Sequence, residues 1–134
     1  MGQALAVKRP YGNLVYKHLM KPVGSGSFSA KQSNVFSATV GEPHAGGTVR
    51  LQVLIDPNNE VIKDARFMAH GCGVLIATAS WVVQSIKGLN LKQAQELNAA
   101  TICAELNLPP VKMYCAILLQ EAVSLAVKNY QLQE

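Results

Sequence analysis

The chain has 134 residues, of which 49% are hydrophobic and 15% are charged, and it carries a net charge of +4. A chain of this length is expected to form one domain, residues 1–134, that buries its own core without disulfide bonds, and its composition excludes an intrinsically disordered protein. Charged or amide residues interrupt every long apolar stretch, so we expect no membrane-spanning segment and no membrane partner.

Residues 1–30 form a basic N-terminal arm. Five of the twelve Lys and Arg residues precede Glu42, the first acidic residue, but they form no dense cluster with aromatic residues between them, so we expect no nucleic-acid partner. Apolar residues recur with helical spacing between 11 and 20, and Pro22 with the Gly- and Ser-rich residues 23–27 ends this helix. No long apolar region precedes a small-residue cleavage site, so no secretory leader is expected. We expect the arm to be weakly held, with fast amide exchange.

Three strand-like segments follow at residues 34–40, 48–55 and 61–69. In the second segment, apolar residues alternate with polar ones, which predicts one buried face and one solvated face. The third segment alternates in the same way, and the intervening residues 56–59, Asp-Pro-Asn-Asn, are typical of a turn. The pattern predicts an antiparallel meander.

Helical periodicity begins after the third strand. A helix is predicted for residues 74–87, Asn90 caps a second helix over 91–97, and Thr101 caps a short third one. A double proline then breaks the chain before a long C-terminal helix over 111–130. Strands followed by helices indicate an α+β fold, a three-stranded antiparallel sheet with helices packed on one face and a long C-terminal helix at the end.

The three cysteines are the residues most informative about chemistry. An odd number of cysteines without an export signal favours free thiols in a reducing compartment, so we expect a cytoplasmic protein. Cys72 lies between two glycines where the third strand meets a helix, a position that favours a thiolate and leaves the sulfur uncovered. A small apolar residue in a tight turn is an equally good interpretation. Local sequence favours core positions for Cys103 and Cys115.

Few other residues suggest chemistry. His44 lies in a loop rich in Pro and Gly, where binding a ligand would be sterically easy, although a surface histidine is the commoner explanation for it and for His18 and His70. The sequence contains no nucleophile elbow, phosphate-binding loop, dinucleotide-binding fingerprint or zinc-ribbon spacing. No base with an orienting partner accompanies a cysteine. We therefore expect that the protein is not an enzyme.

Several short motifs occur in a specific order: Gly41-Glu42-Pro43, Leu51-Gln52-Val53, Asp64-Ala65-Arg66-Phe67, Gly71-Cys72-Gly73, and Leu108-Pro109-Pro110-Val111-Lys112 followed by Cys115. Together they resemble the IscU branch of the IscU/NifU-type iron–sulfur cluster assembly scaffolds, from about residue 11 to residue 130. The resemblance implies a three-stranded antiparallel sheet with helices on one side. It also implies sulfur supplied by a cysteine desulfurase, a two-iron, two-sulfur cluster, and cluster transfer with an Hsp70-type chaperone and co-chaperone, the chaperone binding the motif Leu108–Lys112.

The ligand positions of that family are only partly kept. Its second and third ligand cysteines correspond to Cys72 and Cys115, whereas its first falls on Ala45. Its nearby aspartate falls on Gly47, and the histidine before its third cysteine falls on Tyr114. The chain therefore resembles a degenerate member of this family that keeps two of the three ligand cysteines.

A two-iron cluster needs four protein ligands, and thiolates suit iron best. His44, beside the lost cysteine, is the best replacement ligand, while Tyr114 could bind only after its phenol loses a proton. A homodimer that pools Cys72 and Cys115 from each chain would supply four thiolates. Cysteine at Ala45 and aspartate at Gly47 are expected to raise cluster retention.

Three functions stay open. In the first, a scaffold-like protein binds iron, an iron–sulfur cluster or zinc through Cys72, Cys115 and His44. In the second, a cluster-free paralogue regulates the desulfurase or chaperone, and in the third, Cys115 only accepts sulfur. We expect Cys72 and Cys115 to lie within reach of one another, with residue 44 or 45 at the same end, in an exposed and electropositive setting that lowers the pKa of both thiols.

Overall fold

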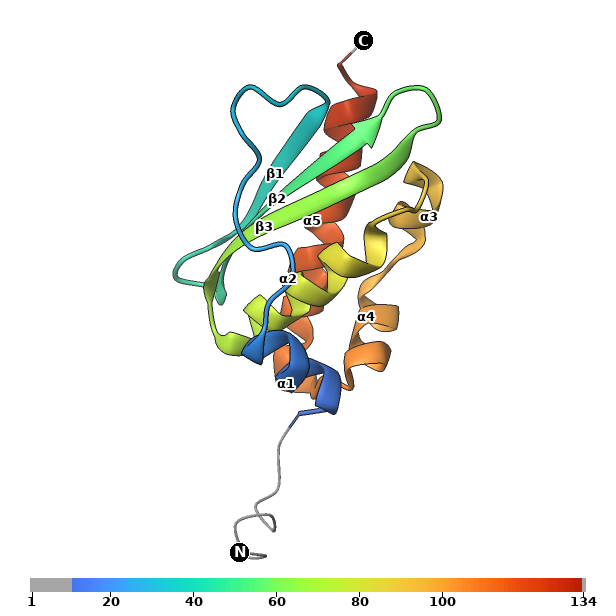
Figure 1. Cartoon of the computed structure of the whole chain (residues 1–134). Coiled ribbons are helices and arrows are strands. Elements are labelled where there is room, and N and C mark those ends of the chain that lie inside the picture. Colours follow the sequence, from blue (N-terminus) through green and yellow to red (C-terminus); the bar gives the residue numbers. More distant parts are fainter. Residues whose placement is uncertain (1–10, 134) are drawn as a thin grey trace, which may run out of the picture.

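A computed structural model describes residues 11–133. Its centre is a three-stranded antiparallel sheet in the order β1-β2-β3, and helices pack against one face of this sheet (Figure 1). The strands are β1 (Val35–Glu42), β2 (Gly47–Asp56) and β3 (Val61–Gly71). The helices are α1 (Asn13–Met20), α2 (Gly73–Ile86), α3 (Leu91–Glu96), α4 (Ala99–Leu106), the 3-10 turn η2 (Pro110–Lys112) and α5 (Met113–Gln131). The predicted α+β fold is confirmed.

Strand β2 forms the middle of the core. Its alternate apolar side chains are no more than 1% exposed, as the period-two pattern predicts; these are Val49, Leu51, Val53 and Ile55. Antiparallel pairing sets Gly47 opposite both Glu42 and Gly71. The β1–β2 hairpin and the end of β3 therefore meet at one end of the sheet, where β3 leads into α2 (Figure 1).

Capping side chains set where the short helices begin. Asn90 Oδ1 accepts a hydrogen bond from the Gln93 N–H over 2.8 Å and caps α3, as predicted. The prediction for the third helix was wrong, because α4 is capped by Asn98, whose Oδ1 accepts from the Thr101 N–H over 2.9 Å. Both Asn and Thr suit a cap, and Asn98 takes the role because it lies at the extended residue before the helix.

The C-terminal helix is long, apolar and packed. Among residues 11–133, one stretch, Pro110–Gln131, has the length and a mean hydropathy of 1.3 that a membrane span requires, contrary to expectation. A core helix passes the same test, and α5 contacts β1, β2 and α2 through buried residues that include Cys115 and Leu119. The apolar side of α5 therefore packs against the sheet and the other helices of this domain.

The N-terminal arm docks on α2 through a buried histidine. His18 is 2% exposed, and its Nδ1 lies 2.7 Å from Ser80 Oγ in α2. The N–H of Val23 donates to the same Ser80 oxygen over 2.6 Å. One hydroxyl thus holds both the helix α1 and the residues that follow it.

The arm then runs along the edge of β3. Gly26 donates from its N–H to the Phe67 carbonyl, and the Phe67 N–H donates to the Gly24 carbonyl, each over 2.9 Å. The N–H of Phe28 donates to Gln52 Oε1 over 2.9 Å. Residues 1–10 lie outside the described residues, and the fast exchange expected for the arm stays a prediction.

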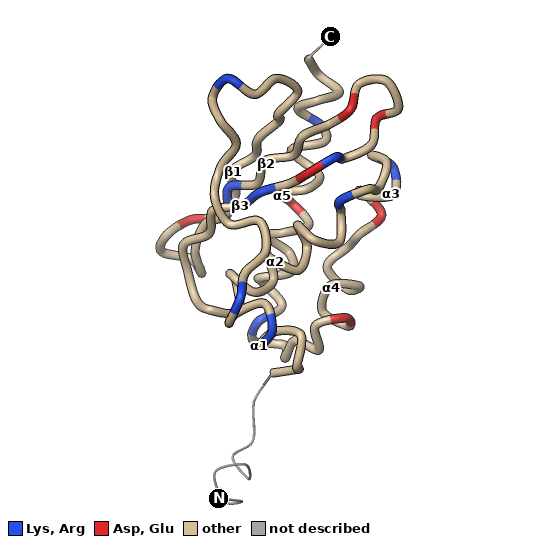
Figure 2. Tube along the Cα trace, viewed as in Figure 1, with Lys and Arg blue, Asp and Glu red and all other residues tan. Residues whose placement is uncertain are grey.

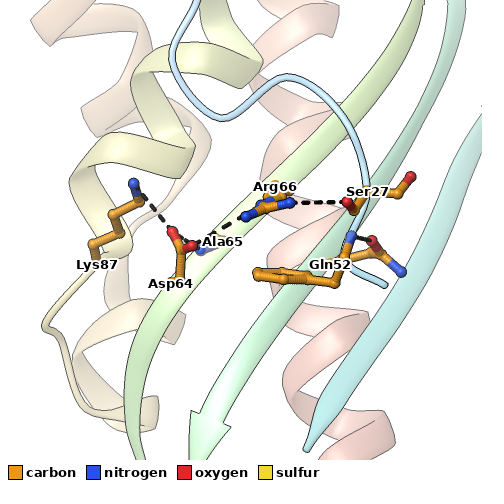
Figure 3. A network of polar contacts seen from close by, with 7 residues as sticks. Ser27, Gln52, Asp64, Ala65, Arg66 and Lys87 are labelled. Atoms are coloured by element: carbon orange, nitrogen blue, oxygen red, sulfur yellow. Dashed lines mark hydrogen bonds and ion pairs between the residues drawn. The ribbon is translucent and has the colours of Figure 1, made fainter. Parts of the chain in front are cut away.

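Side chains of the Asp64–Phe67 motif hold this arrangement from the solvated face of the sheet (Figure 3). Arg66 donates to the Ser27 carbonyl over 2.9 Å, and its guanidinium lies 4.4 Å from the centre of the Phe28 ring. Asp64 pairs with Lys87, just past the end of α2, over 3.1 Å. The motif therefore joins the arm, β3 and α2.

We predict that acid weakens the domain through His18. Burial, followed by the charge of Lys17, lowers the pKa of His18. Because the folded pKa lies below the unfolded value of about 6.5, unfolded chains bind the proton first. The free energy of unfolding should then fall as the pH drops below about 6.5. Urea unfolding over a series from neutral to mildly acidic pH measures this.

The matched variants are His18→Asn, which keeps an acceptor near the Nδ1 position without a titratable group, and His70→Asn at an exposed histidine. The pH dependence should be shallower in the first and unchanged in the second. An undiminished pH dependence in His18→Asn contradicts the prediction.

Candidate functional site

Three chain segments meet at the end of the sheet where β3 joins α2. They are the β3–α2 junction with Cys72, the β1–β2 hairpin, and the start of α5 with Tyr114 and Cys115. The hairpin touches the other two segments closely. A Cβ at Gly46 would lie 2.7 Å from Cε2 of Tyr114, and a Cβ at Gly71 would lie 2.9 Å from the Gly46 carbonyl oxygen. The convergence expected from the sequence is confirmed.

Cys72 is the half-buried residue at the centre of this convergence. It is the N-cap of α2, with an extended backbone. Its sulfur lies 3.2 Å from the hydroxyl of Tyr114 and accepts a hydrogen bond from Lys112 Nζ over 3.6 Å. Helix α1 closes one side, because a Cβ at Gly73 would lie 3.1 Å from Cδ1 of Leu19.

These contacts favour a thiolate at Cys72. Burial by itself raises the pKa of the Cys72 thiol. Four smaller effects lower the pKa and together outweigh burial: the hydrogen bond from Tyr114, the Leu75 N–H, the charge of Lys112 and the interaction with Cys115. The net result is a lowered pKa. Figure 2 shows basic and acidic residues spread over the described chain. Because neither sign of charge is concentrated in one region, the pKa of Cys72 depends mainly on its immediate neighbours.

Cys115 has the opposite character. It is 0% exposed in the first turn of α5. Burial, then the charge of Cys72, raise the pKa of the Cys115 thiol to about 12, against the smaller opposing effects of Tyr114 and Lys112. The expectation of an exposed Cys115 with a lowered pKa was wrong, because Cys115 belongs to the buried core cluster. Each of the two thiols affects the pKa of the other, so the two cysteines lie at the same end of the molecule.

Tyr114 serves the site as a hydrogen-bond donor. Its hydrogen bond to Cys72, followed by burial and the charges of the two cysteines, raises the pKa of the Tyr114 phenol. A phenolate ligand at this position is therefore disfavoured. The proton that Tyr114 keeps is the one it shares with the Cys72 sulfur.

His44 is not brought into a ligand group with the cysteines. It is exposed in the hairpin, and among residues 11–133 no three His, Cys, Asp or Glu side chains gather closely enough to hold a metal ion. The predicted set of Cys72, Cys115 and His44 therefore stays a prediction that requires the hairpin to move. Cys103 lies on α4, where burial raises the pKa of its thiol.

Gly47 cannot be replaced by aspartate without strain. Its φ is +119°, a conformation that favours glycine, and a Cβ there would overlap the carbonyl oxygen of His70. This strain opposes the gain in cluster retention expected from aspartate at Gly47, which stays a prediction. Ala45 is exposed, and a cysteine at that position meets no such constraint on φ.

The motif Leu108–Lys112 leads directly into the site. Pro110 stands at the first position of η2, and Val111 is 76% exposed. Sequence reasoning assigned the whole motif to partner binding and missed the contact of Lys112 with Cys72. The three-residue spacing between Lys112 and Cys115 was the available signal, because residues three apart lie on one helix face.

The family model described as NifU-like N terminal domain matches residues 10–134. The iron-sulfur cluster assembly protein IscU of Plasmodium falciparum is 41% identical over 92% of this chain and 75% of its own length. The iron-sulfur cluster assembly scaffold protein IscU of Escherichia coli is 39% identical over 90% of this chain and 94% of its own length. The scaffold protein IscU of Haemophilus influenzae is 37% identical over 92% of this chain and 98% of its own length.

A crystal structure of a nitrogen-fixing NifU-like protein (N-terminal) from Brucella abortus has the same fold. It matches with a TM-score of 0.68 and 14% identity over 92% of this chain and 95% of that one.

We predict that Tyr114→Phe slows alkylation of Cys72. Losing the hydroxyl removes a hydrogen bond to the thiolate, which raises the pKa of Cys72 and lowers the thiolate fraction at neutral pH. A bond worth ~1 kcal/mol gives a rate roughly fivefold lower. Peptide mass spectrometry after timed iodoacetamide treatment measures each cysteine separately.

The matched control is Tyr130→Phe on the same helix, whose hydroxyl donates to Glu60 over 3.0 Å instead of to a cysteine. It should leave the Cys72 rate unchanged. Equal rates in Tyr114→Phe and the unsubstituted protein would show that the hydroxyl does not stabilise the thiolate.

Proposed function

This chain belongs to the family of NifU-like N-terminal domains, and we propose that it serves iron–sulfur cluster assembly as a scaffold that holds its cargo at Cys72 and Cys115. The position of both cysteines at one end of the sheet, where each affects the pKa of the other, supports the proposal. The role is that of a scaffold rather than an enzyme, in line with the names of its Escherichia coli and Haemophilus influenzae relatives. Two adjacent free thiols suit a reducing compartment, for which we propose the cytoplasm.

The cargo that suits two thiols is iron, a two-iron cluster or zinc. The two cysteines supply half of the four ligands that a two-iron cluster needs. The other half has to come from His44 after movement of the hairpin, from a second copy of the chain, or from a partner. Binding has to displace the Tyr114 hydroxyl from Cys72 and uncover Cys115, so we expect a labile complex.

A second candidate function is acceptance of sulfur at Cys72. Its sulfur is reachable, lies 3.6 Å from an ammonium group and has a lowered pKa, which are the properties of a nucleophilic thiol. Cys115, first considered for this role, is 0% exposed and has a raised pKa. These contrasts favour Cys72 as the first acceptor.

The partners that fit this role are a cysteine desulfurase and an Hsp70-type chaperone with its co-chaperone. Support comes from the Leu108–Lys112 motif, in which Pro110 and Val111 are exposed. Because Lys112 contacts Cys72, a chaperone that binds the motif would change the surroundings of the cargo thiol. A homodimer is the alternative source of the missing ligands.

We predict that metal uptake depends on Cys72 and Cys115 and not on Cys103. After anaerobic incubation with ferrous iron and sulfide, or with zinc, and removal of unbound ions, Cys72→Ser and Cys115→Ser should lose most bound metal. Cys103→Ser is the matched control and should keep it. Metal content and visible absorbance measure the result.

Ala45→Cys should increase cluster retention, because it adds a third thiolate. Gly47→Asp should lower the melting temperature without such a gain. Absence of metal from the unsubstituted protein, with binding to a desulfurase intact, would overturn the cargo proposal and favour a regulatory role.

A further inference from the structure

The outer side of α5 carries a stripe of exposed residues that the domain leaves uncovered. Their spacing puts them on one face of the helix. The members of this α5 stripe are Ile117, Glu121, Ser124, Leu125, Lys128 and, just past the last turn, Leu132. Its three apolar side chains are 43%, 38% and 72% exposed in chain order. Apolar side chains that recur along one exposed helix face suggest a contact surface.

Polar contacts to the rest of the domain mark the two borders of the α5 stripe. On one side, Gln120 Oε1 accepts a hydrogen bond from the Ala99 N–H of α4 over 2.6 Å. On the other side, Asn129 Nδ2 donates to the Ser37 carbonyl of β1 over 2.7 Å. The middle of the stripe adjoins a hollow of about 330 Å³, which is lined by Val40 of β1 together with residues of α5. The surface is therefore shaped to receive a side chain.

The two charged members of the stripe are not used within the domain. Glu121 and Lys128 are both exposed, and in the described part of the chain, residues 11–133, neither side chain forms an ion pair or a hydrogen bond. They are two helical turns apart, roughly 10 Å along the axis, which is too far for them to pair with each other. Their partners have to come from another molecule.

We propose that the α5 stripe is the contact surface between two copies of this chain, which pair with their α5 helices antiparallel about a two-fold axis at the middle of the stripe. The order of residues along the stripe is complementary to its own reverse. The antiparallel pairs are Ile117 with Leu132, Glu121 with Lys128, and Ser124 with Leu125. Two-fold symmetry makes each of these contacts occur twice.

Each pair suits its neighbour chemically. Leu125 of one copy meets the small side chain of Ser124 and the hollow beside it in the other, so a large side chain enters an open space. The end pairs join two apolar side chains, and burial of apolar surface supplies most of the attraction. An exposed ion pair contributes only ~0.2–1 kcal/mol, so Glu121 and Lys128 act mainly on direction. A parallel arrangement in the same register would place like charges together.

The dimer is expected to be weak. Its contact is limited to one face of a 19-residue helix, which is small beside the roughly 1,600 Å² that a standard protein interface buries. Antiparallel pairing also sets the first turn of α5 in one copy beside the last turn in the other. The two Cys115 residues are then separated by roughly 28 Å along the helix axis. This dimer therefore cannot pool thiols from two chains, and the inference does not depend on the cargo proposal.

The test is sedimentation velocity of the full chain, metal-free and with a reductant, over a concentration series. We expect a monomer that becomes a dimer as the concentration rises. Glu121→Lys and Lys128→Glu should each raise the dissociation constant of the dimer roughly tenfold, because each replaces two ion pairs by two like-charge pairs. The double variant Glu121→Lys, Lys128→Glu should restore the dimer, since the opposite charges again face each other.

Mixing the two single variants gives a second test with the same proteins. An equimolar mixture should form mixed dimers about as tightly as the unsubstituted chain does with itself, because every charge then meets its opposite. The matched control is Glu96→Lys at an exposed position of α3, which makes the same charge change away from the stripe and should leave the dissociation constant unchanged.

Three results overturn the inference. They are a chain that stays monomeric at every concentration, a dimer that both single charge reversals leave unchanged, and a loss of dimer that neither the double variant nor the mixture restores.

Discussion

The contact between the Cys72 sulfur and the Tyr114 hydroxyl joins the first turn of α2 to the first turn of α5, and the chemistry of the site depends on it. The 3.2 Å separation gives the thiolate a donor. It also places the Tyr114 ring against the hairpin at Gly46. The half-buried Cys72 has a donor at its sulfur, whereas Cys115 is 0% exposed, so the two cysteines differ in reactivity.

Two of the three departures from the ligand pattern that the IscU resemblance implies, Gly47 and Tyr114, lie on segments that pack closely together. The hairpin approaches β3 so closely that Gly47 has no room for a Cβ, and Gly46 has none because the Tyr114 ring lies above it. A carboxylate at residue 47 would separate these segments. The hairpin therefore packs closely against its neighbours and carries no aspartate at residue 47. The site keeps two thiols, with the Tyr114 hydroxyl and the Lys112 ammonium group next to Cys72.

Much of the fold could be predicted from the sequence because it follows from local patterns. Alternation in β2 identified the buried face, and Asn90 identified the start of α3. The Cys72 position could also be predicted, since glycines flank it at a junction. The burial of Cys115 could not, because it depends on how α5 packs against the sheet and the other helices. The same holds for Lys112, whose contact with Cys72 spans 40 positions, and for the choice of Asn98 over Thr101 as a cap.

The different roles of Cys72 and Cys115 depend on a difference in the ionisation of their thiols. Selective labelling of the cysteine β-carbons, followed by NMR over a pH series, measures the ionisation of each thiol directly. The account predicts that Cys72 ionises first, below the ordinary range of a thiol, while Cys115 remains protonated until the pH nears its pKa of about 12. Ionisation of Cys115 before Cys72, or of both thiols together, would contradict it.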